Sequence, residues 1–237
     1  MKIRIKFAKE GTMKFIGHLD VMRYFQKVMR RADVDIRYSE GFSPHQIMSF
    51  ASPLGVGMES RGEYVDIEVL STDSSKEMLR RINDVIGDEM EALSYRLLPD
   101  HAANAMSIVA AADYIVKFRE EYAPEDWDAF AAGLETFLAQ DEIMILKKTK
   151  KGEKEMNLRP LIYELCAKEG KQIRMKIATG SAANIKPDAV IRAYMESRGE
   201  ELKDFALLIT RMEVYGNRGT DEKMDLCPLE DFGEDIE

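Results

Sequence analysis

Side chains that suit nucleic-acid chemistry are concentrated in residues 38–46, which read Tyr-Ser-Glu-Gly-Phe-Ser-Pro-His-Gln. Three are aromatic and can stack on bases, and two carry hydroxyls that can reach phosphates. The aromatic residues are Tyr38, Phe42 and His45, and the hydroxyl residues are Ser39 and Ser43. Gly41 permits close backbone approach and Pro44 breaks regular structure, so we predict a binding loop. The alternative is a glycine–proline turn whose Phe42 packs in the core.

A second polar group, His18, Asp20 and Arg23, lies at the start of a predicted helix. Histidine titrates near neutral pH and arginine offers a two-pronged fork, so the group suits acid–base work or phosphate binding. A structural interpretation is favoured, however. His18 satisfies backbone groups at the helix start and Asp20 caps the first turn. Asp20 and Arg23, three residues apart, then form a surface pair.

Basic residues are segregated along the chain although the net charge is -9. Residues 1–47 carry ten bases against five acids, whereas residues 213–237 carry two bases against nine acids. The basic segment includes Arg23, Arg30 and Arg31 in the predicted helix. Five further lysines surround Gly152: Lys147, Lys148, Lys150, Lys151 and Lys154. We predict a basic hairpin tip that attracts a polyanion by counterion release, the alternative being a solvated turn that keeps sheet edges soluble.

The run Gly17-His18-Leu19-Asp20 followed by Arg23, together with residues 38–45, resembles the radical SAM-linked family. Its members are encoded beside a radical SAM enzyme or fused after one, so the resemblance implies such an enzyme as a partner in trans. A radical SAM enzyme needs three cysteines to hold its iron–sulfur cluster. This chain has only Cys166 and Cys227, far apart. We therefore expect that it does not perform the radical step, and we expect no cofactor and no metal.

The periodicity of apolar residues predicts an α+β fold. Alternating residues indicate strands at 2–8, 34–38, 63–70 and 90–98, and helical spacing indicates helices at 19–32 and 74–86. A similar order recurs with strands at 113–120, 143–148, 158–165, 173–178 and 205–215 and helices at 124–139 and 187–194. We predict two tandem ferredoxin-like (split βαβ) lobes with antiparallel sheets, at residues 1–101 and 113–215. An acidic tail at residues 216–237 follows.

These observations favour an accessory RNA-binding protein that presents structured RNA, a tRNA or rRNA, to a radical SAM modification enzyme. A second hypothesis is a metal-independent endoribonuclease resembling the CRISPR repeat-processing enzymes, with His18, His45 and Tyr38 as candidate catalytic residues. A third is a protein-interaction module that docks on the radical SAM partner without RNA. Two distant cysteines and an N-terminus that is neither signal peptide nor membrane span predict a cytoplasmic protein with no membrane contact.

Overall fold

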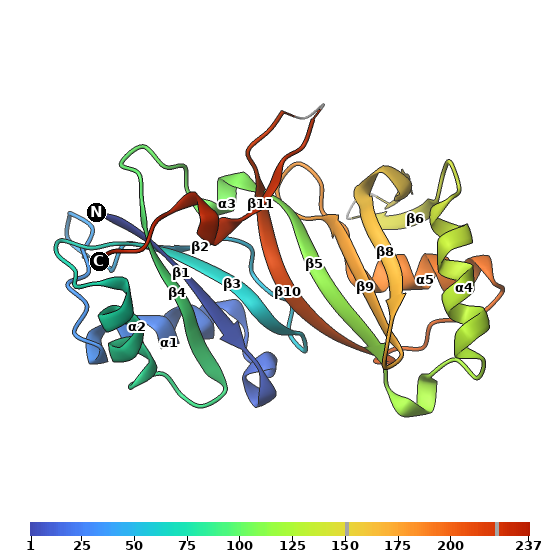
Figure 1. The fold of residues 1–237 in the computed structure, drawn as a ribbon, viewed down its shortest axis with the longest axis horizontal. Helices are drawn as coiled ribbons and strands as arrows, with labels where there is room; N and C mark the ends of the chain where they lie inside the picture. The colour runs from blue at the N-terminus through green and yellow to red at the C-terminus, as the bar shows by residue number, and fades with distance from the viewer. Residues whose placement is uncertain (150–151, 221–222) are drawn as a thin grey trace. The chain divides into compact units, whose positions relative to one another are not determined.

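The chain folds into two compact units of mixed helix and strand (Figure 1). The computed structural model describes residues 1–149, 152–220 and 223–237. Unit 1 combines Met1–Ala110 with Arg211–Glu237, and unit 2 is Ala111–Thr210. The described part of the chain holds five α-helices, and its sheet is mostly antiparallel. The α+β class predicted from the sequence is therefore confirmed.

Unit 1 begins with six elements in the order β-α-β-β-α-β. They are β1 (Lys2–Lys9), α1 (His18–Arg31), β2 (Met48–Phe50), β3 (Glu59–Glu68), α2 (Ser75–Asn83) and β4 (Met90–Leu98). The strands lie side by side in the order β4-β1-β3-β2, and each neighbouring pair is antiparallel. A 3-10 turn, η1 (Gly11–Phe15), leads into α1, and a short helix, α3 (Ala105–Ile108), follows β4. Figure 1 shows α1 and α2 on one side of these strands.

The core of unit 1 lies between the strands and the two helices. The apolar side of β1 supplies Ile3, Ile5 and Phe7, all fully buried, because alternate residues of a strand face the same side. The rings of Phe7 and Phe25, the latter from α1, lie 4.4 Å apart between centroids. This packing fixes which face of α1 turns inward. The opposite face, with its charged residues, is left to solvent.

The end of the chain covers the polar side of β1. It comprises β10 (Leu207–Asn217), β11 (Leu226–Pro228) and η4 (Leu229–Phe232), and its residues from Arg211 onward belong to unit 1. Arg4 of β1 is wholly buried and donates from Nη1 to the carbonyl of Leu229 at 3.1 Å. Residues 226–237, which we placed in an acidic tail, thus pack on unit 1.

Ionised side chains fill this second interface. The Nζ atom of Lys6 lies 2.6 Å from a carboxylate oxygen of Glu213 and 2.6 Å from one of Glu230. Glu213 also accepts from the hydroxyl of Tyr64 at 2.6 Å. The guanidinium of Arg4 forks onto Asp66 at 2.7 and 2.9 Å. Arg4 and Lys6 are therefore neutralised inside unit 1, and they add nothing to an exposed basic surface.

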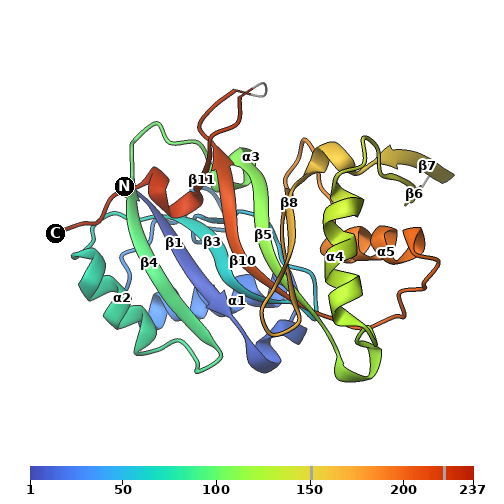
Figure 2. The same cartoon turned by 45° about the vertical axis from the view of Figure 1, so that its right-hand side comes forward.

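Unit 2 repeats much of this order around a separate core. Its elements are β5 (Val109–Phe118), η2 (Glu120–Tyr122), α4 (Trp127–Leu138), β6 (Met144–Thr149), β7 (Gly152–Asn157), η3 (Arg159–Leu161), β8 (Ile162–Lys168), β9 (Gln172–Ala178) and α5 (Pro187–Ser197), followed by the start of β10. The strand order is β10-β5-β9-β8, while β6 and β7 form a separate hairpin. Figure 2 shows that hairpin close to α5. Phe130 and Tyr194, on α4 and α5, are buried against each other.

Two predicted strands differ in the structure. Residues 34–38 contribute only isolated bridges, Ile36 to Val69 and Tyr38 to Gln46, because the chain leaves the sheet at once to form a loop. The strand predicted at 158–165 begins at Ile162, after a 3-10 turn that contains Pro160. Strand β7 was not predicted, since its sequence Gly-Glu-Lys-Glu-Met-Asn has no apolar alternation and its first four residues are exposed.

Candidate nucleic-acid interface

Exposed arginines follow the outer face of α1. Arg23, Arg30 and Arg31 all lie on the exposed side of the helix. Arg23 pairs weakly with Asp20, at 3.4 Å, and both side chains are more than 60% exposed. Arg30 and Arg31 have no ion pair with any residue that the structure describes. Two unpaired guanidinium groups therefore lie at the end of α1, where their positive charge also interacts favourably with the helix dipole.

Residues 36–47 form a narrow hairpin beside α1. Tyr38 and Gln46 are bridged as antiparallel partners, and the amide of Ser39 donates to the carbonyl of His45 at 2.8 Å. Ser39 Oγ lies 2.9 Å from His45 Nδ1 and accepts from the His45 amide at 3.1 Å. These bonds hold the aromatic loop in one conformation. We call residues 38–46 the aromatic hairpin.

Phe42 stands at the tip of the aromatic hairpin. Its exposure is 111% of the reference value, the highest among the exposed apolar residues of the described chain. Gly41 turns the tip with φ of +106°, a conformation that side chains with a Cβ rarely adopt. Ser43 and Pro44 are exposed as well. Phe42 does not pack in the core, so the packed-turn alternative is wrong, and the binding loop stays a prediction.

Gln46 ties the aromatic hairpin to α1. Its Nε2 donates to the backbone carbonyl of Gln26 in α1 at 3.3 Å and lies 3.5 Å from the hydroxyl of Tyr38. Because a backbone carbonyl requires a donor, this contact assigns the amide orientation, with Oε1 turned away. Gln46 Oε1 is buried and accepts no hydrogen bond among the described residues. The aromatic hairpin and the arginines of α1 are thus parts of one surface.

Arg30 and Tyr38 line the same hollow on that surface. The hollow has a volume of about 540 Å³ and also takes in Asp33, Asp35, Ser71 and Arg81. Tyr38 is 46% exposed, so one part of its ring is open to a ligand. An open aromatic ring beside a free guanidinium is an arrangement that can hold a nucleotide by stacking and by charge.

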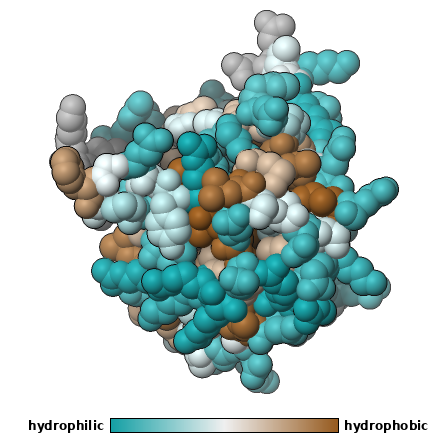
Figure 3. Space-filling view, turned by 90° about the vertical axis from the view of Figure 1, so that its left-hand side faces the viewer, coloured by the Kyte–Doolittle hydropathy of each residue, from teal (hydrophilic) through white to brown (hydrophobic). Residues whose placement is uncertain are grey.

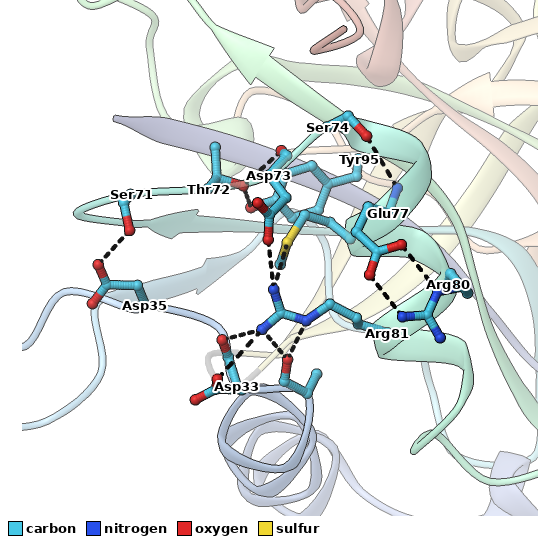
Figure 4. Close-up of polar contacts among 12 residues, drawn as sticks. Asp33, Asp35, Ser71, Thr72, Asp73, Ser74, Glu77, Arg80, Arg81 and Tyr95 are labelled. Atoms are coloured by element: carbon cyan, nitrogen blue, oxygen red, sulfur yellow. Dashed lines mark hydrogen bonds and ion pairs between the residues drawn. The ribbon is translucent and has the colours of Figure 1, made fainter.

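Arg81 of α2 holds the rim of this hollow in place (Figure 4). Its Nε and Nη2 donate to the carbonyl of Ala32 at 2.9 and 2.6 Å, and its Nη1 donates to Asp73 at 2.8 Å. These bonds satisfy a carbonyl at the end of α1 that the helix leaves free. Asp33, the next residue, has a φ of +52°, which reverses the chain. Arg81 therefore fixes where α1 stops and where the hairpin begins.

The first turn of α2 is fixed in a similar way by its own side chains. Ser74 Oγ accepts from the amide of Glu77 at 3.3 Å and caps the helix. Arg80 forks onto Glu77 at 2.7 and 3.0 Å, and this bond lowers the pKa of the Glu77 carboxyl. Figure 4 shows both contacts on the side of α2 that carries Arg81. The helix that presents Arg81 is thus anchored at its start.

The two histidines occupy different parts of the surface. His18, the first residue of α1, packs edge-on against Phe50 with ring centroids 5.3 Å apart. His45 lies in the aromatic hairpin, which meets α1 at Gln26, eight residues further along. Eight residues advance a helix by about 12 Å. His18 thus lies at the start of α1, whereas the hairpin that carries His45 contacts the helix further along, at Gln26.

The predicted lysine cluster belongs to unit 2. Lys147 and Lys154 are cross-strand partners in the β6–β7 hairpin, and Lys148 is opposite Glu153. Lys154 is exposed, whereas Lys150 and Lys151 lie outside the described residues. Glu153 and Glu155 interrupt the basic run on the second strand. The hairpin is thus of mixed charge where the structure describes it.

Sequence reasoning missed part of this surface. Asp35, Ser71 and Arg81 were not singled out, and they meet Arg30 and Tyr38 only in the folded unit. No local motif indicates them, because Asp35 and Arg81 lie 46 positions apart in the sequence. Gln46 was noted only as the neighbour of the aromatic stretch. Its burial depends on α1, which a local pattern does not reveal.

Comparisons with known proteins identify a family but no activity. A family model described as "Uncharacterized protein conserved in bacteria (DUF2344)" matches residues 2–187. No curated protein matches the chain. A chain in the crystal structure of a Cbf5-Nop10-Gar1 complex is similar at 11% identity with a TM-score of 0.49, over 90% of this chain and 48% of that one. This chain therefore spans about half the length of that relative.

No helix in the described ranges is long and apolar enough to cross a bilayer. Likewise, the described residues hold no cluster of three or more His, Cys, Asp or Glu side chains that is arranged to bind a metal ion.

Proposed function

We propose that this protein, which belongs to the DUF2344 family of uncharacterized proteins conserved in bacteria, is an accessory RNA-binding protein that acts with a radical SAM enzyme. One observation carries the proposal. A fully exposed Phe42 stands on a hairpin that is hydrogen-bonded to the helix bearing the unpaired Arg30 and Arg31. Exposed aromatic rings stack on unpaired bases, and guanidinium groups bind the phosphates between them. The same two features are the usual parts of a single-strand binding surface.

Both units share one strand order. In each unit the fourth strand, the first, the third and the second lie side by side, with a helix after the first and after the third. This is the order of a ferredoxin-like (split βαβ) fold, and we infer two such lobes in tandem, with β6 and β7 inserted in the second. The fold alone assigns no function, so the proposal depends on the surface residues.

The radical SAM partner is inferred from residues 17–20, Arg23 and residues 38–45, which resemble the radical SAM-linked family. With only two cysteines the chain has too few to hold the cluster of such an enzyme, so in this proposal the radical step belongs to the partner. We propose that the RNA is a structured tRNA or rRNA with an unpaired loop, and that the proteins meet in the cytoplasm. The surface would hold the loop while the partner modifies it.

The endoribonuclease alternative has less support from the geometry. Of the three candidate catalytic residues, His18 packs against Phe50, while Tyr38 and His45 share the aromatic hairpin, where His45 Nδ1 already lies 2.9 Å from Ser39 Oγ. A protein-docking role has a specific observation in its favour. Figure 3 shows hydrophobic residues gathered among hydrophilic ones on one face of the protein. Such a patch suits a protein partner and is compatible with RNA binding elsewhere.

Binding of a fluorescein-labelled tRNA, followed by anisotropy at several salt concentrations, tests the proposal. We expect Phe42→Ala to weaken binding at least fivefold, because stacking on an aromatic ring contributes about 1–3 kcal/mol per base. Phe205→Ala is the matched control, since Phe205 is 88% exposed and lies in unit 2. The double change Arg30→Ala, Arg31→Ala should flatten the plot of log K against log salt by roughly 1.5.

Absence of RNA binding by the wild-type protein at low salt would refute this function. Equal losses in the Phe42 and Phe205 variants would show that the aromatic hairpin has no special role. A pull-down of the radical SAM partner, with and without ribonuclease, separates the docking role. Capture that survives ribonuclease, together with no RNA binding, would support docking in place of RNA recognition.

A further inference from the structure

The hollow beside the aromatic hairpin contains an unusual acceptor. Asp35 lines it together with Arg30, Tyr38 and Ser71, and its volume of about 540 Å³ falls within the range of small-ligand sites, about 300–1,000 Å³. Asp35 is exposed and has no ion pair in the described part of the chain. An aspartate that meets a ligand here acts only as an acceptor of hydrogen bonds.

Ser71 orients the carboxylate of Asp35. The Ser71 hydroxyl donates to Asp35 Oδ2 at 2.7 Å, as Figure 4 shows, and the amide of Leu70 donates to the Asp35 carbonyl at 2.9 Å. The other carboxylate oxygen, Oδ1, has no partner among the described residues. Side chain and backbone are therefore both fixed, and Oδ1 together with the second lone pair of Oδ2 is left for a ligand. Pre-oriented groups of this kind lose little freedom on binding.

The cations of the hollow are not used to neutralise Asp35. Arg81 donates to the carbonyl of Ala32 and to Asp73, and its remaining acidic neighbour in the hollow is Asp33, at 3.9 Å. Arg30 has no ion pair with any described residue and can bind a phosphate. Positive and negative groups of the hollow are thus both open to a ligand that has a phosphate at one end and donors at the other.

Guanine is the base that best fits these acceptors. Its Watson–Crick edge presents two adjacent donors, N1–H and the 2-amino group, whereas adenine, cytosine and uracil each present one donor next to an acceptor. A carboxylate can accept both guanine donors, but its second oxygen repels the acceptor that the other bases carry. Donor-rich ligands are therefore favoured.

We propose that the hollow formed by Arg30, Asp35, Tyr38 and Ser71 binds one unpaired guanine nucleotide of the RNA. Tyr38 stacks on the base, Asp35 accepts from its Watson–Crick edge, and Arg30 binds the adjoining phosphate. Ser71 is a positioning residue that acts through Asp35. This inference rests on the proposed RNA-binding function, and it adds the base that the surface selects.

Binding of octauridylate strands in which one central base is replaced by guanine, adenine, cytosine or hypoxanthine tests the inference. We expect the guanine strand to bind about tenfold more tightly than the adenine and cytosine strands, which is the discrimination of a two-point contact to a base edge. The hypoxanthine strand, which lacks the 2-amino group, should fall in between. Asp35→Asn should remove the guanine preference because an amide replaces one acceptor by a donor, while affinity for plain octauridylate stays within about twofold.

Asp33→Asn is the matched control. Asp33 lies on the same rim, but its carboxylate faces Arg81, so this variant should keep the guanine preference. Ser71→Ala should reduce the preference without abolishing it. Equal binding of all strands by the wild type overturns the guanine inference and leaves RNA binding intact. No binding of any strand or of tRNA overturns the proposed function, and the guanine inference with it.

Discussion

Replacing Lys6 by methionine should destabilise unit 1 by about 3 kcal/mol. The ammonium group of Lys6 lies between the carboxylates of Glu213 and Glu230, 2.6 Å from each. Methionine keeps the length and apolar stem of lysine but removes the charge. Two carboxylates then remain together in a covered position, with no cation between them. Glu213 keeps its bond from the Tyr64 hydroxyl, so Glu230 suffers most.

The magnitude follows from the burial of the three side chains. Breaking a buried ion pair costs about 3–5 kcal/mol because it leaves an uncompensated charge. The side chains of Lys6, Glu213 and Glu230 retain 14%, 13% and 19% exposure, so some solvent reaches them and the lower end of the range applies. With a urea dependence of about 2–3 kcal/mol per molar, the unfolding midpoint should fall by roughly 1–1.5 M.

Urea unfolding followed by circular dichroism measures this change, and Arg80→Ala is the control. Arg80 also contacts two carboxylates, each at 2.7 Å, but its side chain is 60% exposed and solvent screens the pairs. The Arg80 variant should shift the midpoint only marginally. Adding Glu230→Gln to Lys6→Met should recover part of the loss. If both single variants shift the midpoint equally, the covered position of Lys6 has no energetic consequence and the reasoning is wrong.

Three further predictions concern the same side of unit 1. Gly62→Ala should lower the free energy of unfolding by about 1–3 kcal/mol or abolish folding, because the added Cβ would lie 2.7 Å from the Cα of Glu213. A urea midpoint equal to that of the wild type would contradict this. Leu229→Ala should lower the free energy of unfolding by about 2–5 kcal/mol in the same assay, because Leu229 is fully buried. A loss as small as that at an exposed residue would mean that the chain end is not packed on unit 1. Stability should fall above about pH 10, which urea midpoints from pH 8 to 11.5 will show. Burial and the nearby Glu213 raise the pKa of Tyr64. Burial alone would lower the pKa of Lys6, but its bonds to Glu213 and Glu230 raise it overall. As the pH rises, the unfolded chain therefore loses both protons before the folded chain does, and the free energy of unfolding falls. Tyr64→Phe should flatten this alkaline loss.

The sequence predicted β1, α1, α2 and β4 of unit 1 well because their periodicity is local, whereas the strand predicted at 34–38 contributes only isolated bridges. Ile3, Ile5 and Phe7 alternate with bases, and the structure has a strand there. Such alternation is typical of a half-buried strand, but six of the eight residues, all except Lys2 and Lys6, are buried, and these six include Arg4 and Lys9. An alternating pattern looks the same whether its polar side meets water or opposite charges. The groups that cover it are more than 200 positions away in sequence.

The candidate site was predictable in its composition but not in its assembly. The aromatic stretch indicated a binding loop, and Phe42 is exposed as that interpretation requires. The same residues were equally compatible with a packed turn, because the sequence of a loop does not determine whether its phenylalanine faces the core or the solvent. Asp35 carried no signal at all. Its importance depends on Ser71, which reaches it from the chain segment that follows β3.

Unit 1 is assembled from both ends of the chain, with the whole of unit 2 between its two pieces. A ribosome must therefore add the 127 residues that follow Ala110 before Arg211–Glu237 can close on β1. At about 5–20 residues per second this takes roughly 6–25 s. Unit 2 is continuous and can fold within that interval, while Arg4 and Lys6 of the nascent chain still lack Leu229 and Glu230. The first unit in sequence is thus the last to be completed, and a nascent chain arrested before residue 211 would expose the side of β1 that the finished protein never shows.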